Sequence, residues 1–140
     1  MYQTKQSAGL DLQSTQTVRL EPGERAVVDT GVYLEDVRPS FTRTTLDKTY
    51  TYFAMVCPRS GLAAKYGLTV LNAPGIVDLD YPDTIKVILM NHGQETVYLG
   101  EGTRIAQLVF TVAYRRAELV KDEERTSGLG STGTGGIECQ

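Results

Sequence analysis

Short apolar or alternating runs, separated by turn residues, make up most of the chain. Alternation of apolar and polar residues is typical of strands that bury one face, and the connecting segments EPGE, HGQ and GEG have the composition of tight turns. Seven runs are predicted to be strands: residues 17–20, 25–34, 49–57, 68–72, 84–91, 95–99 and 104–112. Many short strands at this spacing predict an all-β fold of the barrel or jelly-roll type.

One segment has a helical signature instead. In SGLAAKYG, Ser60 is a suitable N-cap and Gly67 stands where a C-cap glycine belongs. A single short helix is therefore predicted at about residues 60–66. The segment FTRTTLDK, residues 41–48, is predicted to be a polar loop.

The composition of the chain changes near its C-terminal end. Beyond Lys121 the residues are charged and then rich in glycine, serine and threonine, which is typical of flexible segments. We therefore expect one folded domain over residues 1–120 and a flexible arm over residues 121–140. A length of 140 residues also favours a single domain.

The bulk composition excludes several classes of protein. A net charge of −3 argues against a general nucleic-acid binder but leaves room for a small anionic ligand. Two cysteines and one histidine are too few for a disulfide scaffold or a zinc site. The first residues, MYQTKQSAG, lack the apolar stretch of a signal peptide, and no apolar run is long enough for a bilayer. These features predict an intracellular protein, in cytosol or nucleus, without a membrane partner.

Two stretches carry candidate chemistry. In PRSGLAAKYG, a capped helix end beside Arg59 would offer amides and a positive charge to an anion, although an ordinary surface helix has the same sequence features. In NAPGIVDLDYPD, Asp78 and Asp80 are two apart and share a face of a strand. A carboxylate in a dry, concave site can accept a proton from water, but a polar β-turn explains the same residues.

Three further features raise questions of the same kind. Asp11 lies between apolar residues, which is unusual unless it is paired or near a cation. Arg104 and Gln107 are three apart, so on a regular strand they are expected to face opposite sides, and one of them is expected to be structural. The run RTSGLGSTGTGG, residues 125–136, is either a linker or a segment whose amides and hydroxyls wrap a phosphate chain.

The order of these stretches is more specific than any one of them. The segments SAGLDL, PRSGLAAKYGL, NAPGIVDLDY, GTRIAQLV and GLGSTG resemble, in sequence and in order, the five motifs of the homotrimeric dUTP diphosphatases, or dUTPases. The resemblance runs from Ser7 to Gly133. It implies a jelly-roll β-barrel that forms a homotrimer with active sites at the subunit interfaces. It also implies hydrolysis of dUTP to dUMP and pyrophosphate with Mg2+.

The resemblance implies roles for individual residues. Asp78 would be the base that activates water for attack on the α-phosphate, and Asp11 would order metal-bound waters. Tyr81 would pack under the deoxyribose and exclude a ribose 2′-hydroxyl. Phosphate contacts are implied for Arg59, Ser60, Gly61 and Gln107. Base or further substrate contacts are implied for Asn72, Gly75, Ile76, Val77 and Lys86, while Arg104 is expected to be mainly structural.

The chain also departs from the family pattern. The fifth motif has four steps from Arg125 to Leu129, where the family has five steps to an aromatic that stacks on uracil, so stacking is expected to be weaker. Gly130, Ser131 and Thr132 are expected to wrap the γ-phosphate. YPDT, residues 81–84, replaces a tyrosine, a variable residue and glycine. Residues 38–50 resemble an insertion that could bind a protein partner, and these departures suggest a compact, divergent member of viral type.

Two alternatives stand beside hydrolysis. In the related dCTP deaminases, the position of the catalytic glutamate aligns with Ile88, which cannot carry a proton, so deamination is not expected. A dUTPase-like regulatory module with weak or lost catalysis is the second alternative, supported by the insertion and the altered arm. The retained acids, Tyr81 and Gln107 favour catalysis.

Overall fold

The computed structural model describes residues 1–44, 47–123, 125, 127–130, 133, 137 and 139, and these residues form an all-β fold. The strands are β1 (Leu10–Gln13), β2 (Val18–Leu20), β3 (Arg25–Tyr33), β4 (Tyr50–Cys57), β5 (Leu68–Val70), β6 (Gly75–Asp78), β7 (Thr84–Asn91), β8 (Val97–Leu99) and β9 (Arg104–Tyr114). The helical segments are α1 (Leu34–Val37), α2 (Ser60–Tyr66) and the 3-10 turns η1 (Ser40–Arg43) and η2 (Ala117–Leu119). All seven predicted strands are present, with shifted ends in most.

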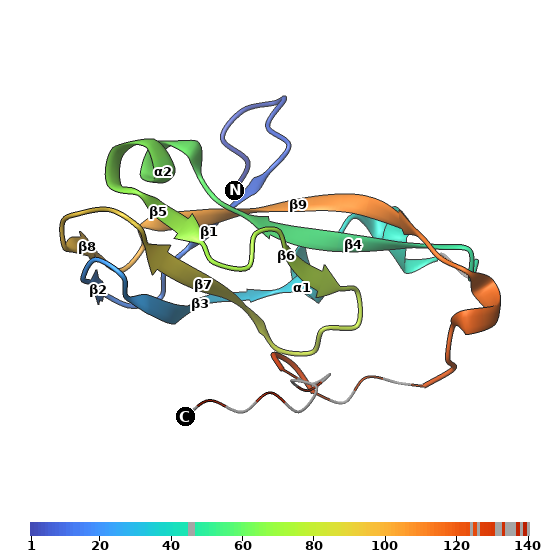
Figure 1. Cartoon of the computed structure of the whole chain (residues 1–140). Coiled ribbons are helices and arrows are strands. Elements are labelled where there is room, and N and C mark those ends of the chain that lie inside the picture. The colour runs from blue at the N-terminus through green and yellow to red at the C-terminus, as the bar shows by residue number, and fades with distance from the viewer. Residues whose placement is uncertain are drawn as a thin grey trace.

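Three antiparallel sheets enclose one core, as expected of a jelly roll. The strand orders are β1-β9-β4-β6, β3-β7-β5 and β2-β8. Figure 1 shows β9 and β4 running along the length of the molecule, with β3 and β7 below them and α2 at one end. The described part of the arm passes back beneath β6 after η2. The end of β6, where Asp78 lies, and the arm are therefore on the same side of the domain.

Alternation explains which strand residues are buried. On β7 the side chains of Ile85, Val87 and Leu89 are fully buried, while the residues between them are partly exposed. Leu12 of β1 and Leu108 of β9 close the other side of the core. Each fully buried Leu, Ile or Val side chain contributes about 1.5–3 kcal/mol relative to exposure. Burial of one face of each strand therefore determines which side chains point outward, where they can contact a ligand.

The predicted helix is present as α2, with one correction at its start. The N-cap residue is Arg59, whose side chain makes no capping hydrogen bond, and Ser60 is the first residue of the helix. The C-terminal end agrees with the sequence, because Gly67 has a left-handed φ of 69° and its N–H bonds to the carbonyls of Ala63 and Leu62. No helix in the described ranges is both long and apolar enough to cross a membrane.

The expectation of one helix was wrong, because two further turns form in the region read as a strand end and a polar loop. Leu34 begins α1 instead of ending β3, since its side chain is completely buried and anchors the turn. Residues 40–43 form η1, which Arg38 holds by donating to the Oγ1 and carbonyl of Thr42. Residues 45 and 46 of the predicted insertion lie outside the described residues.

We predict that Asn91→Ala lowers the free energy of unfolding by about 2–3 kcal/mol. Asn91 is completely buried, and its amide donates to the carbonyls of Leu20 and Glu95 at 2.9 Å each and accepts from the N–H of Gly93 at 2.8 Å. The substitution leaves buried carbonyls without a donor. Urea unfolding at one fixed protein concentration measures the loss. The exposed neighbour variant Gln94→Ala is the control, and equal midpoints for the two variants would contradict the assignment.

Candidate active site

The first half of the site centres on the carboxylate of Asp11. Its side chain on β1 is only 9% exposed, with Arg59 Nε 3.5 Å from Oδ1 and Arg104 Nη1 3.6 Å from Oδ2. Oδ2 is buried and has no hydrogen-bond partner among the described residues. A buried carboxylate oxygen without a donor is costly for the fold. The two guanidinium groups offset the charge, and the free oxygen remains available to a cation or to its bound water.

The prediction that Arg104 and Gln107 face opposite sides is wrong. Gln107 lies directly opposite Asp11 in the β1–β9 register, so the two side chains share a face. The register then shifts, because Leu12 lies opposite Ala106 but Gln13 lies opposite Arg104. This irregularity adds one residue to β9 and brings Arg104 to the side of Asp11. A single sequence gives no signal for such a shift.

A shallow pocket of about 350 Å3 opens beside this carboxylate at the start of α2. Arg59, Ser60, Gly61 and Gln107, the four residues predicted to contact phosphate, all line it, together with Leu62, Lys65 and Tyr66. Arg59 is fixed by donating from Nη1 to the carbonyl of Arg104, and Gln107 by donating to the carbonyl of Pro58 at 3.0 Å. Sequence reasoning missed Lys65, which adds a second cation to the pocket.

The second half of the site is the connection from β6 to β7, residues 78–84, a tight turn between strands of two different sheets that we term the hairpin. Asp78 ends β6, and its carbonyl accepts the N–H of Tyr81 in a tight turn. The carboxylates of Asp78 and Asp80 are both 60% exposed, and both approach the guanidinium of Arg125. The two acids thus lie on one side of the hairpin as predicted, although Asp80 lies in the turn and not on the strand.

A narrow apolar pocket lies next to these acids. Asn72, Gly75, Ile76, Val77, Tyr81 and Lys86, the residues predicted to contact the base and sugar, all line it, together with Val56, Ile85, Ile88 and Leu129. The structure thus brings the whole predicted set to one place. Ile88 entered the sequence argument only as evidence against deamination, although the alternation of β7 already turned it away from the core.

Lys86 is held in a polar cluster at the edge of this pocket. Its amino group lies 3.1 Å from Asp29 Oδ1 and also donates to the hydroxyl of Thr84. The hydrogen bond from Thr84 is the main cause that lowers the pKa of Asp29 to about 2. Burial of the carboxylate opposes this shift, and smaller contributions from Gly31 and Lys86 lower the pKa further. Sequence reasoning did not single out Asp29, whose pattern resembles any exposed acid on a strand.

The two halves do not meet within one chain. Asp78 lies opposite Phe53 on β4, whereas Gln107 lies opposite Cys57, four residues along the same strand. At about 3.3 Å per residue the offset along the strand is roughly 13 Å. Between them the outward face of the sheet is apolar, with Met55 directly opposite both Ile76 and Val109.

Residues of the arm lie against the hairpin of the same chain. Arg125 pairs with Asp78, Leu129 lines the apolar pocket, and Gly130 is exposed. Residues 131 and 132, predicted to wrap a phosphate, lie outside the described residues.

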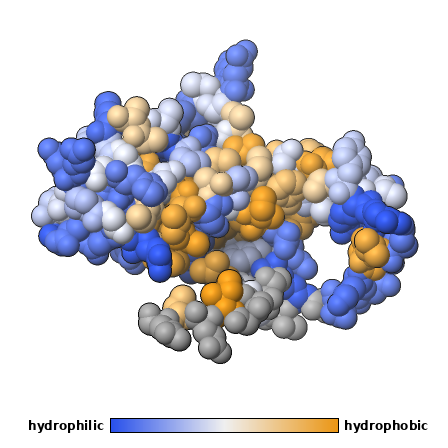
Figure 2. All heavy atoms as spheres, viewed as in Figure 1, coloured by the Kyte–Doolittle hydropathy of each residue, from blue (hydrophilic) through white to orange (hydrophobic). Residues whose placement is uncertain are grey.

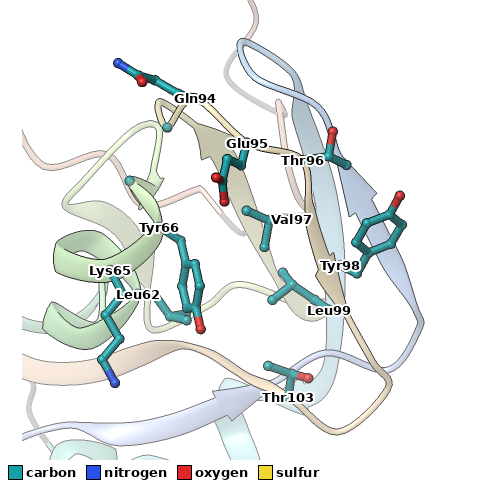
Figure 3. Close-up of a pocket in the computed structure, with 12 residues that line it drawn as sticks. Leu62, Lys65, Tyr66, Gln94, Glu95, Thr96, Val97, Tyr98, Leu99 and Thr103 are labelled. Carbon is teal, nitrogen blue, oxygen red and sulfur yellow. The ribbon is translucent and has the colours of Figure 1, made fainter.

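A larger cavity, of about 780 Å3, lies away from the acids. Figure 3 shows it between α2 and the β7–β8 connection, with Leu62, Val97 and Leu99 at its base and Lys65 and Glu95 beside its opening. It shares Leu62, Lys65 and Tyr66 of α2 with the shallow pocket at the start of that helix. None of the residues predicted to act on a substrate lines it.

Comparisons with known proteins agree with the sequence motifs. A family model described as dUTPase matches residues 1–135. The deoxyuridine 5′-triphosphate nucleotidohydrolase of Nautilia profundicola is 41% identical over 138 residues, which cover 94% of this chain and 88% of the relative. The protein of the same name from Beijerinckia indica is 45% identical over 144 residues, covering 96% and 82%. Among solved structures, a point mutant of the dUTPase from phage phi11 of S. aureus, which holds a structural Mg(II) ion, has the same fold. The TM-score is 0.65 at 24% identity, and the match covers 91% of this chain and 90% of the phage protein.

We predict that Asp29→Asn destabilises the protein by about 1 kcal/mol at neutral pH, after allowance for the solvent screening of a partly exposed pair. The pKa of Asp29 is lower in the folded state than its ordinary value of 3.8, so its contribution is present above about pH 4 and is lost as the pH falls through about 2. Urea unfolding at several pH values should show the difference from wild type shrinking in acid. The exposed Asp36→Asn variant is the control, and a difference that persists at about pH 2 would contradict the cause.

Proposed function

Because the chain belongs to the dUTPase family and hydrolyses dUTP, we propose that Asp78 is the general base of this reaction and that the hairpin after β6 binds the deoxynucleoside. One observation carries the proposal. The predicted base and sugar residues line a single pocket, and Asp78 stands at its edge, on the same strand as Gly75, Ile76 and Val77. A carboxylate at the mouth of a nucleoside pocket is placed to act where the α-phosphate begins.

The chemistry assigned to Asp78 is proton transfer. An ionised carboxylate accepts a proton from a water molecule as the water oxygen forms a bond to the α-phosphorus. The bond from the α-phosphorus to the bridging oxygen breaks, and pyrophosphate leaves with the electron pair. The products are dUMP and pyrophosphate, and the proton stays on Asp78 until it passes to solvent. No covalent intermediate with the protein is needed.

The pocket at the start of α2 is assigned to the phosphate chain. Arg59 and Lys65 supply positive charge, and the amides and side chains of Ser60, Gly61 and Gln107 supply donors. Hydrogen bonds from charged donors to phosphate oxygens are about twice as strong as neutral ones. Donors held in place before the reaction also stabilise the charge that develops on the leaving pyrophosphate.

The residues present fit Mg2+ that is held mainly by the triphosphate. No cluster of three or more His, Cys, Asp or Glu side chains is placed to hold a metal in the described part of the chain. Mg2+ usually keeps several waters and binds one or two carboxylates together with phosphates. Asp11, with its unpartnered Oδ2, would hold those waters. When bound, the ion offsets negative charge on the phosphate oxygens.

Tyr81 and the arm are assigned to selectivity and closure. The ring of Tyr81 is partly buried against the core and lines the nucleoside pocket, so it offers a flat surface under a deoxyribose and little room for a 2′-hydroxyl. Crowding in the same pocket would reject a 5-methyl group. Gly130, Ser131 and Thr132 would wrap the γ-phosphate, with Arg125 as a charged partner. Leu129 offers apolar contact to the base but cannot stack on it as an aromatic side chain would. Stacking of a base on an aromatic side chain contributes about 1–3 kcal/mol.

A homotrimer with active sites at subunit interfaces would join the two halves of the site. The offset along β4 separates Asp78 from Gln107 within a chain, and the outward face between them is apolar, with Ile76 59% exposed. Figure 2, viewed as Figure 1, shows apolar residues gathered over the middle of the molecule, where β4 and β6 lie. Burial of this face by neighbouring chains would bring the phosphate pocket of one chain to the hairpin of another.

Two further assignments concern a protein partner and the cellular compartment. Phe41, on η1 within residues 38–50, is 63% exposed and would suit contact with a protein partner. The free thiols of Cys57 and Cys139 are compatible with a reducing compartment, in the cytosol or nucleus.

The substrate preference tests the nucleoside pocket. We predict pyrophosphate release from dUTP and at least tenfold slower release from UTP, dTTP and dCTP, with Mg2+ present; a tenfold ratio corresponds to about 1.4 kcal/mol. Tyr81→Ala should bring UTP closer to dUTP, whereas Tyr98→Ala, a change at an exposed tyrosine on β8, should not. Absence of turnover with every nucleotide would contradict the enzyme assignment, and equal rates with UTP and dUTP would contradict the role of Tyr81.

Mixing variants tests whether two chains share a site. We predict that Asp11→Asn and Asp78→Asn are each nearly inactive alone, and that Asp78→Asn still binds nucleotide. Chains of the two variants, unfolded together and refolded in equal amounts, should regain about a quarter of the wild-type rate, because a site then receives both acids from two different chains. Refolding each variant alone is the control. A mixture as inactive as its parents would show that both acids serve the same chain.

A further inference from the structure

We propose that the arm docks on the hairpin of its own chain and there competes with the deoxynucleoside of the substrate. The docking site consists of the hairpin residues Asp78, Asp80, Tyr81 and Asp83, and its occupant is the arm segment that contains Arg125, Gly128 and Leu129. The proposal rests on the proposed function in one respect, because it takes Tyr81 and the pocket beside it as the nucleoside site.

Arg125 makes the central contacts. Its Nη1 lies 2.8 Å from Asp78 Oδ2 and 3.8 Å from Asp80 Oδ1, and its guanidinium carbon lies 5.3 Å from the centre of the Tyr81 ring. The side chain is only 18% exposed, although it belongs to a glycine-rich segment. The guanidinium is thus held both by a cation–π contact with the ring and by ion pairs with two carboxylates. Arg125 therefore covers the ring face and the carboxylate that the substrate needs.

The backbone of the arm fits the hairpin as closely as the side chain does. Arg125 Nε donates to the carbonyl of Ser127 at 2.8 Å, which curls the arm toward the hairpin. Gly128 is buried, and a Cβ at this position would collide with Oδ2 of Asp83. Only glycine fits this contact without displacing the acid. Asp83 stands in the YPDT stretch that departs from the family motif, so the departure has a partner in the arm.

Leu129 completes the overlap with the substrate. It lines the same pocket as Asn72, Val77 and Tyr81, which are assigned to the base and sugar. With Leu129 in its wall the pocket holds only about 50 Å3, far less than the roughly 300 Å3 of the smallest ligand pockets. A nucleoside can therefore enter only when the arm moves. The contacts are nevertheless weak, because the acids are mostly exposed and such pairs contribute little. The docked arm is therefore a strap that a nucleotide displaces, at a cost of several-fold in affinity.

Binding of dUMP tests the competition without the triphosphate. The β- and γ-phosphates that the arm would grip are missing from dUMP, so the docked arm can only oppose it. We expect Arg125→Ala to bind dUMP about three- to tenfold more tightly than wild type by calorimetry. Gly128→Ala should act in the same direction without a change of charge. The control Arg116→Ala removes an exposed arginine that pairs with Glu118 and should leave affinity unchanged.

The possible outcomes distinguish docking of the arm from the proposed nucleoside pocket. Equal or weaker binding of dUMP by Arg125→Ala and Gly128→Ala would overturn the strap while leaving the nucleoside pocket intact. Failure of dUMP to bind wild type and all variants would contradict the nucleoside pocket itself, and the strap would fall with it.

Limited proteolysis gives a second readout whose sign is decisive. Trypsin cuts after arginine, and the docked position shields Arg125. We expect saturating dUMP to speed cleavage after Arg125 several-fold, as mass spectrometry of the fragments would show, while cleavage after the exposed Lys121 stays constant. Slower cleavage after Arg125 with dUMP would mean that the arm closes over the nucleotide instead, and would overturn the proposal.

Discussion

The pairing of β4 with β9 holds the rest of the molecule in place. Eight residue pairs run from Tyr50 opposite Tyr114 to Cys57 opposite Gln107. The outer edge of β9 carries β1, and the outer edge of β4 carries β6, so both acids of the site take their positions from this ladder. A slip of one residue would turn Gln107 toward the core and Leu108 toward solvent. The register is thus protected by the same core that leaves the outward face free for chemistry.

The outward face separates charges of opposite sign. One end carries Arg59, Lys65 and Arg104 around the single carboxylate of Asp11, and the other end carries the acids of the hairpin. The net charge of −3 conceals this division. Opposite charges at two ends of an apolar face suit a head-to-tail contact between chains, which closes into a ring when the rotation allows. The same acidic end attracts the guanidinium of the arm.

On both proposals taken together, the arm has two competing partners, the hairpin and the phosphate chain of the substrate. Its departures from the family pattern meet at the hairpin, because Leu129 enters the pocket lined by Tyr81 and Gly128 packs against Asp83. An aromatic residue in place of Leu129 would add stacking on the base, whereas Leu offers apolar contact to the empty pocket as readily as to a nucleotide. We therefore expect Leu129 to weaken the grip of the arm on the substrate without loosening its contact with the hairpin.

The sequence by itself determined most of the local elements and named residues that the structure brings together in two pockets. The alternation in residues 84–91 predicted β7 with its observed bounds, and Gly67 marked the end of α2, because side-chain period and backbone φ are local properties. Only the tertiary structure decided which strands pair, in which register, and which site residues lie close together. The strands β1 and β6 were not among those predicted, and the register shift opposite Arg104 arises only when β1 and β9 pair. Asp78 and Gln107 are separated along β4, and Arg125 lies over the ring of Tyr81. Both arrangements depend on distances through space that no spacing along the chain encodes.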